Sequence, residues 1–260
     1  MKRTSKLAAG TFNKSAAIIV FLLLWELCAR LKLLINPIFL PPFTRVMQAL
    51  FVMAANGTLW KHTAISLQRS LIGFALGMAV AIPLGLAIGW FKRFGGILNP
   101  LLQLFRNMPT LALLPVFVMF FGIGEFSKVM VILWGVMWST LLNTISGVRN
   151  VDPQLVKAAR SMGTSPLRLF GTVILPASMP YIFAGMRISA TVSILILIAA
   201  EMMGANKGLG YALFFYQANF KIAEMYVYII VMAVLGSVLN FTLEAVEQRS
   251  FRWRDGAGTA

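Results

Sequence analysis

Residues 151–176 read VDPQLVKAARSMGTSPLRLFGTVILP, a long polar stretch between two strongly apolar runs. Its first half carries the signals of a helix, because Asp152 is a preferred N-cap residue and Pro153 suits the first turn. Gly163 suits the left-handed residue that ends a helix. The stretch therefore predicts a helix, a glycine break and then a second helix.

The second helix of this hairpin is predicted to begin at Ser165 and Pro166 and to stop at Pro176. The first helix has one apolar side, whereas Lys157 and Arg160 are expected to stay in water. That apolar side consists of Leu155, Ala158, Ala159 and Met162. A hairpin of this kind is expected to press against another surface.

The composition indicates a membrane protein. Of the 260 residues, 59% are hydrophobic and only 12% are charged, unlike a soluble globular domain. Crossing a bilayer of about 30 Å takes about 20 apolar residues, and the chain offers about six such runs. We predict an all-helical polytopic membrane protein with spans at 15–29, 66–90, 98–121, 128–146, 181–203 and 225–244. The first span is the shortest and contains Glu26.

The N-terminal apolar run is interpreted as an uncleaved span rather than a signal peptide. Trp25, Glu26 and Leu27 disrupt both a small-residue cleavage site and a lipobox before Cys28. Cys28 is the single cysteine, so an intramolecular disulfide is excluded.

The distribution of basic residues predicts the orientation. With the N-terminus inside, most lysines and arginines fall on the cytoplasmic side, which follows the positive-inside rule. Both termini and the hairpin at 151–176 are then cytoplasmic. A net charge of +15 would favour nucleic-acid binding in a soluble chain, but no basic stripe interleaved with exposed aromatic residues supports it here.

The chain is predicted to have three parts. Residues 1–58 hold a cytoplasmic tail, the first span and an external segment whose amphipathic run, 43–55, lies at the membrane interface. Residues 59–247 form the membrane core, with the cytoplasmic loop 151–176. Residues 248–260 form a short cytoplasmic tail at the lipid headgroups.

Small residues at four-residue spacing predict close helix packing along the second span. Such residues let two backbones approach where no hydrophobic effect drives helix association, although glycine is also simply common in membrane helices. The seam comprises Gly73, Gly77, Ala81, Gly85 and Gly89. Pro83 predicts a kink in the same span, and Pro109 and Pro115 predict kinks in the third.

The sequence does not indicate an enzyme. It has one histidine, His62, and neither a metal-binding cluster nor a phosphate-binding loop of the G-x-x-x-x-G-K-[ST] type. If transport consumes ATP, another chain must bind the nucleotide.

The hairpin resembles the EAA loop, EAA-x3-G-x9-I-x-L-P, of permease subunits in binding-protein-dependent ABC importers with the type I fold. Lys157-Ala158-Ala159, Gly163 and 173–176 (VILP) carry the likeness, in the loop before the fifth span. Lys157 replaces the glutamate of the motif and Val173 replaces its isoleucine. The likeness extends over about 59–247, most of the chain.

Within that family the chain is similar to the nitrate, taurine, alkanesulfonate and bicarbonate permeases. The segments that carry this likeness are RNMP (106–109), LLP (113–115), FGIGE (121–125), AAE (199–201) and GLGY (208–211). The resemblance implies import of a small anion, preferably nitrate, taurine or another sulfonate. Bicarbonate and thiamine-precursor or other heterocycles remain alternatives.

The resemblance implies a transport complex of several subunits. It consists of a homodimer of this chain in the bacterial plasma membrane, two ABC ATPase subunits that bind ATP and Mg, and an external solute-binding protein. The residues implied to couple to the ATPase are Lys157, Ala158, Ala159, Gly163, Thr164, Ser165, Pro166, Leu167, Arg168 and Phe170. An ion-driven secondary transporter is the rival class, but its usual inverted repeats and midplane acidic or histidine relays are missing.

Charged residues inside apolar runs need a reason, because each costs about 2.5 to 3.5 kcal/mol on insertion scales. Glu201 lies near an outer span end, where a gate or binding-protein contact competes with interfacial anchoring. Arg187 lies near an inner end, where pathway lining or an ion pair competes with extension of the side chain to water. Arg106 and Asn107, just before Pro109, are further candidates for the pathway.

Overall fold

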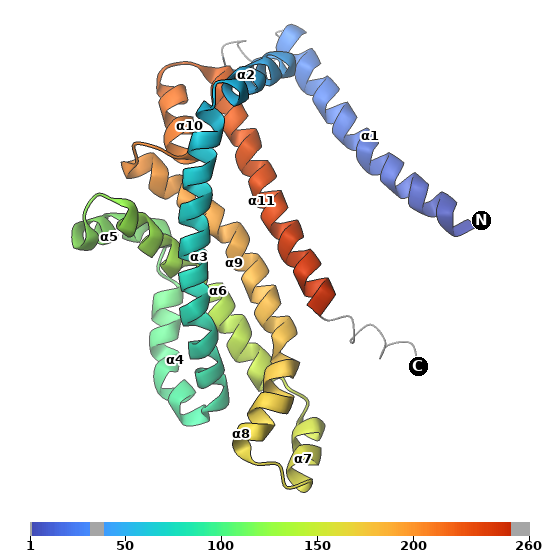
Figure 1. Cartoon of the computed structure of the whole chain (residues 1–260), viewed down its shortest axis with the longest axis vertical. Coiled ribbons are helices and arrows are strands. Elements are labelled where there is room, and N and C mark those ends of the chain that lie inside the picture. Colours follow the sequence, from blue (N-terminus) through green and yellow to red (C-terminus); the bar gives the residue numbers. More distant parts are fainter. Residues whose placement is uncertain (1, 32–38, 251–260) are drawn as a thin grey trace. The chain divides into compact units, whose positions relative to one another are not determined.

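The computed structural model describes residues 2–31 and 39–250, and every regular element in these ranges is a helix (Figure 1). Most of the predicted C-terminal tail, from residue 251 onward, lies outside the described residues. The elements are α1 (Lys2–Leu31), α2 (Phe43–Ala55), α3 (Thr58–Trp90), α4 (Lys92–Arg106), η1 (Thr110–Leu113), α5 (Leu114–Phe121), α6 (Glu125–Arg149), α7 (Pro153–Ser161), α8 (Pro166–Leu169), η2 (Phe170–Ile174), α9 (Leu175–Gly204), α10 (Leu209–Ala218) and α11 (Ile222–Ser250).

Four helical stretches in the described part are long and apolar enough to cross a membrane. They are α3, α6, the continuous stretch Pro166–Gly204 and α11 up to Arg249. A fifth exists if α4 and the η1–α5 segment count as one broken span. The predicted first span, 15–29, lies inside α1, which is not among these four.

The third predicted span, 98–121, is not one helix. Its two halves, Lys92–Arg106 and Thr110–Phe121, are bent by 85°. Pro109 explains the break, because it cannot donate a backbone hydrogen bond and it disfavours helical geometry in the residue before it. The predicted kink at Pro109 is therefore a large change of direction, and the third predicted span is one span only if its two bent halves are counted together.

The chain divides into two compact units, each described by itself. The first comprises 1–63 and 212–231, and it contains α2, whose bounds match the predicted amphipathic run 43–55. Glu26 in α1 forms an ion pair with Arg30 at 2.6 Å and accepts a hydrogen bond from the Thr44 amide at 3.1 Å. The Trp25 indole donates to the Pro41 carbonyl at 3.0 Å. These contacts fix the end of α1 to the start of α2.

The second unit comprises 64–211 and 232–260, and α6 is its central element. α6 and α9 pack along each other, and Val131, Ile132 and Val136 on α6 are fully buried. Ser189 on α9 donates to the Val136 carbonyl at 2.6 Å and lies 2.9 Å from the Thr140 hydroxyl. Polar residues of the fifth predicted span thus bond to neighbouring helices.

The small-residue seam of α3 lies against α6. A Cβ added at Gly77 would lie 2.5 Å from Val136 Cγ2, and one added at Gly85 would lie 2.7 Å from Thr144 Cβ. Ala81, between them, is fully buried. Along this line the two helices are too close for any larger side chain.

Candidate functional site

The hairpin at 151–176 is held by local hydrogen bonds. Asp152 caps α7 by accepting a hydrogen bond from the Gln154 amide at 2.8 Å, as its position predicts. Gly163 follows the helix with φ of 72°, the left-handed conformation predicted for it. The Thr164 amide then donates to the Ala159 carbonyl at 3.2 Å and closes the end of α7. The turn has a defined geometry that depends on glycine.

The second half of the hairpin continues into the membrane span. α8 begins at Pro166, as predicted, although the Ser165 side chain makes no capping hydrogen bond. The prediction that Pro176 stops this helix was wrong, because Pro166–Gly204 is one continuous helical stretch. The π-helical turn η2 precedes α9, and Pro176 falls at the first turn of α9, where a missing backbone N–H is tolerated.

One side of the hairpin packs on the bundle. Ala159, Leu169 and Ile174 are buried, and the Phe170 ring meets the Trp90 ring edge to face at 5.3 Å. Ile174 belongs to a small core with Val148 at the end of α6. These contacts fix the hairpin to the ends of α3 and α6.

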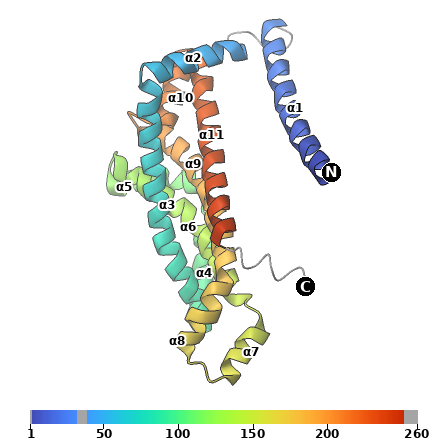
Figure 2. The ribbon, with the colours of Figure 1, turned by 45° about the vertical axis from the view of Figure 1, so that its right-hand side comes forward.

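On the opposite side of the hairpin, large apolar side chains are exposed to solvent. Leu155 is 53% exposed, Met162 is 78% exposed and Leu167 is 87% exposed. The predicted apolar side of α7 is therefore not its packed side, since only Ala159 of that set is buried. We call Leu155, Met162 and Leu167 the outer face of the hairpin; Figures 1 and 2 show α7 and α8 beyond the ends of α6 and α9.

The residues predicted to couple to an ATPase divide between these sides. Ala159 is buried, and Thr164 and Phe170 are half-buried. The remaining predicted residues are exposed: Lys157, Ala158, Gly163, Ser165, Pro166, Leu167 and Arg168.

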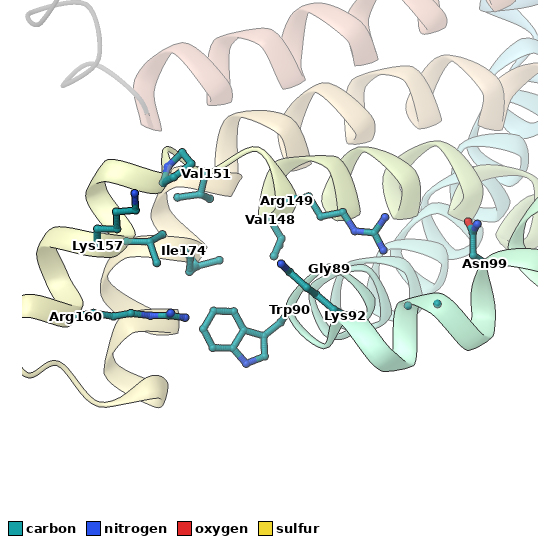
Figure 3. Close-up of a pocket in the computed structure, with 14 residues that line it drawn as sticks. Gly89, Trp90, Lys92, Asn99, Val148, Arg149, Val151, Lys157, Arg160 and Ile174 are labelled. Atoms are coloured by element: carbon teal, nitrogen blue, oxygen red, sulfur yellow. The ribbon is translucent and has the colours of Figure 1, made fainter.

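A cavity of about 920 Å³ separates α7 from the ends of α3 and α6 and the start of α4. Its basic lining residues are Lys92, Arg149, Lys157 and Arg160, and we call it the basic cavity. Arg160 extends from α7 toward the Trp90 ring, and Lys92 enters from the other side (Figure 3). Trp90, Val148 and Ile174 supply an apolar wall.

At the other end of α9, Glu201 is fully buried. Its carboxylate accepts hydrogen bonds from the Ser66 hydroxyl at 2.7 and 2.8 Å, from Arg69 Nη1 at 2.7 Å and from the Gly210 amide at 2.9 Å. The alternative prediction, that Glu201 reaches water at the membrane interface, is therefore wrong. Gly208 leaves the space that the carboxylate occupies, since a Cβ there would lie 2.3 Å from Glu201 Oε1, and a Cβ at Gly210 would lie 2.4 Å from the Ile198 carbonyl oxygen.

Arg69 joins this carboxylate to two further segments. Its guanidinium is paired with Glu125 at the start of α6 and donates to the Lys207 carbonyl at 2.7 Å. The side chain of Arg69 is 5% exposed, whereas that of Glu125 is 67% exposed. We call Ser66, Arg69, Glu125 and Glu201 the buried charge network.

Arg69 and Glu125 were not among the predicted functional residues. The available signal was that Arg69 and Glu201, which both lie within apolar runs, require partners. Local spacing gives no such pairing, because 132 residues separate Arg69 from Glu201.

The other pathway candidates do not lie in this network. Arg106, Asn107 and Pro109 are exposed around the break between α4 and η1. Arg187 on α9 forms an ion pair with Glu247 on α11, and its side chain is 36% exposed. The structure thus gives Arg187 an ion-pair partner and keeps it apart from Glu201.

Comparison with known proteins decides the family. The family model described as the binding-protein-dependent transport system inner membrane component matches residues 73–252. The chain belongs to this family. It is therefore an ABC importer permease subunit, and its relatives are membrane components rather than enzymes.

Named relatives of this permease include sulfonate transporters. The taurine transport system permease protein TauC of Escherichia coli is 34% identical over 90% of this chain and 86% of its own. The putative aliphatic sulfonates transport permease protein SsuC of Escherichia coli is 36% identical over 88% of this chain and 87% of its own. SsuC of Bacillus subtilis is 31% identical over 91% and 85% of the two chains.

Solved structures support the fold. An inward-facing MetNI methionine ABC transporter matches with a TM-score of 0.63 at 17% identity, over 71% of this chain and 92% of that chain. An amino acid ABC transporter crystallised with histidines matches with a TM-score of 0.59 at 18% identity, over 78% and 96%. In the described part of this permease, no group of three or more His, Cys, Asp or Glu residues is placed to hold a metal ion.

Proposed function

We propose that this permease, as a homodimer, forms the membrane pathway of an ABC importer for small sulfonates such as taurine. The relatives named for taurine and aliphatic sulfonates at 31 to 36% identity support this substrate class. Nitrate is a further anion implied by the sequence likeness, and bicarbonate and thiamine-precursor heterocycles are the alternatives. An external solute-binding protein delivers the cargo.

The observation that carries the mechanism is the outer face of the hairpin. Leu155, Met162 and Leu167 are more than half exposed, although the hairpin itself is fixed to the bundle. Exposed apolar groups on a protruding element are typical of a protein interface. In this proposal the outer face docks into a groove of an ABC ATPase, which binds ATP and Mg.

The hairpin transmits the motion of the ATPase because it is rigid at both ends. Asp152 and Gly163 fix α7 locally, and α8 runs without interruption into the membrane span. Two ATPase subunits that close on ATP would move the two hairpins and, with them, the spans. The hairpin and both termini are then cytoplasmic, in the bacterial plasma membrane.

Transport of labelled taurine tests the cargo. The permease is produced with its ATPase and binding protein in cells that lack their own sulfonate importers. ATP-dependent uptake of taurine or an alkanesulfonate is expected, and both are expected to compete with each other. Uptake of nitrate or bicarbonate without sulfonate uptake would contradict the sulfonate assignment while leaving the importer mechanism in place.

Gly163→Val tests the coupling. Valine is strained at φ of 72°, so we expect the α7–α8 turn to distort and uptake to be lost, with normal membrane insertion. Gly171→Val is the matched control, since both glycines have open space around them but Gly171 has no positive φ. Equal uptake by the Gly163→Val variant and the control would contradict coupling through this hairpin.

A further inference from the structure

The basic cavity carries a concentration of positive charge. Lys92, Arg149, Lys157 and Arg160 line it, and no carboxylate is among its lining residues. The ion pairs between described residues involve Arg30, Arg69 and Arg187 instead. The four cations of the cavity are therefore not neutralised within the described part of the chain.

The shape of the cavity depends on a glycine that makes room for one of these cations. A Cβ added at Gly95 would lie 2.7 Å from Arg149 Nη2 and 2.7 Å from the Ile88 carbonyl oxygen. Gly95 is buried in the first turn of α4, so the guanidinium of Arg149 rests directly on the α4 backbone. Arg149 is exposed to solvent, and its guanidinium lies beside α4 at the cavity.

The remaining wall of the cavity is apolar. Trp90, Val148 and Ile174 line it, and the Trp90 ring stands beside Arg160 (Figure 3). A small hydrated anion needs only the cations, whereas a ligand with an acidic head and an apolar body would contact both parts of the lining. The lining therefore favours an amphiphile.

The composition of α4 favours a place for this cavity at the level of the lipid headgroups. α4 begins at Lys92 beside the cavity, and its Phe94, Ile97 and Leu101 are 41%, 74% and 50% exposed. A helix with basic residues at its start and exposed apolar groups along one side is typical of the membrane interface. Basic pockets between membrane helices at this level bind phosphate-bearing headgroups.

We propose that the basic cavity binds the phosphate group of an anionic phospholipid from the adjacent leaflet. The phosphate lies between Lys92 and Arg160, and the start of the acyl region lies against Trp90. Bound there, the lipid connects α7 to α3 and α4 and becomes part of the support of the hairpin. This site is distinct from the outer face and does not depend on which solute the permease carries.

Lipid binding to the full permease tests this proposal. Detergent-solubilised protein is titrated with phosphatidylglycerol or phosphatidylcholine, and bound lipid is counted by native mass spectrometry. The variant is Lys92→Gln/Arg160→Gln, which changes two exposed side chains outside the predicted ATPase contacts. The control, Lys61→Gln/Lys221→Gln, removes the same charge from two exposed lysines that do not line the cavity.

Wild-type protein is expected to prefer phosphatidylglycerol over phosphatidylcholine. The double variant is expected to lose about thirty-fold in affinity for phosphatidylglycerol, at about 1 kcal/mol for each of two cations. The single variant Lys92→Gln is expected to lose about five-fold, which keeps the test valid if the double variant folds poorly. The control is expected to change by no more than about two-fold.

Three results would overturn the proposal. Equal losses in the variant and the control would mean that the lipid responds only to total charge. Displacement of phosphatidylglycerol by inorganic phosphate at equal concentration would assign the cavity to a free anion. An unchanged lipid preference in the variant, together with loss of ATPase co-purification, would assign the cavity to acidic residues of the ATPase.

Discussion

Among the charged side chains described in the membrane core, Arg69 is expected to contribute most to the free energy of unfolding. Arg69→Leu leaves the Glu201 carboxylate fully buried, with only the Ser66 hydroxyl and the Gly210 amide as donors. Removal of one partner from a buried ion pair costs about 3 to 5 kcal/mol, because the other charge stays uncompensated. We expect a loss in that range.

A double-mutant cycle separates the pair from the individual residues. Glu201→Leu should cost less than Arg69→Leu, because Arg69 retains Glu125 and the Lys207 carbonyl. Arg69→Leu/Glu201→Leu removes both charges, so its loss should fall short of the sum of the single losses by about 1 to 3 kcal/mol. Unfolding in mixed micelles with rising dodecyl sulfate, followed by tryptophan fluorescence, gives the free energies.

Arg187→Leu is the matched control for this cycle. Arg187 also pairs with a glutamate of another helix, but 36% of its side chain is exposed, and exposed ion pairs contribute about 0 to 1 kcal/mol. Two outcomes would show that the buried charge network does not hold the helices together. In the first, Arg69→Leu lowers the free energy of unfolding no more than Arg187→Leu does. In the second, the double variant loses the full sum of the two single losses.

Three further predictions concern the seam and the hairpin. Gly77→Ala should destabilise the permease by about 1 to 3 kcal/mol through overpacking against α6, whereas Gly96→Ala, with open space around it, should not; the same micelle assay measures both. Asp152→Ala should cost about 1 kcal/mol by loss of the α7 cap, visible as faster proteolysis of the hairpin. Leu167→Ser should leave stability unchanged, since this side chain is 87% exposed, but should reduce co-purification of the ATPase; retention of the ATPase would argue against docking by the outer face.

The local structure of the hairpin was predictable because its signals are local. Asp152 caps the residues that follow it, and Gly163 adopts a conformation that other residues avoid. Such preferences act over a few residues and can be recognised in the sequence. The helix over 43–55 was predictable for the same reason, since a proline precedes it and Asn56-Gly57 ends it.

The effect of each proline was less predictable because it depends on geometry beyond the local sequence. Pro109 separates two helices at 85°, whereas Pro176 is accommodated within a continuous helical stretch. Pro176 follows the π-helical turn at Phe170–Ile174, which moves the missing N–H to the start of α9. A sequence pattern does not indicate where a helix widens into such a turn.

Contacts between distant segments were outside the reach of pattern analysis. The small residues of α3 predict that some helix lies close, and the structure places α6 there. The partner of Glu201 could not be predicted, because any arginine or lysine at the same depth satisfies the same need. The exposed side of α7 was also unpredictable, since an apolar side can meet either the chain itself or a partner.

The continuous stretch Pro166–Gly204 has a consequence for how force travels. Its 39 residues rise about 1.5 Å each, so it is a rod of about 58 Å with the hairpin at one tip and Glu201 near the other. Arg69 ties the Glu201 end to α3 and α6, and the hairpin end packs on the ends of the same two helices, so the stretch is held near both ends. Force applied to the hairpin would then pass along this stretch to Glu201, and through Arg69 to α3 and α6.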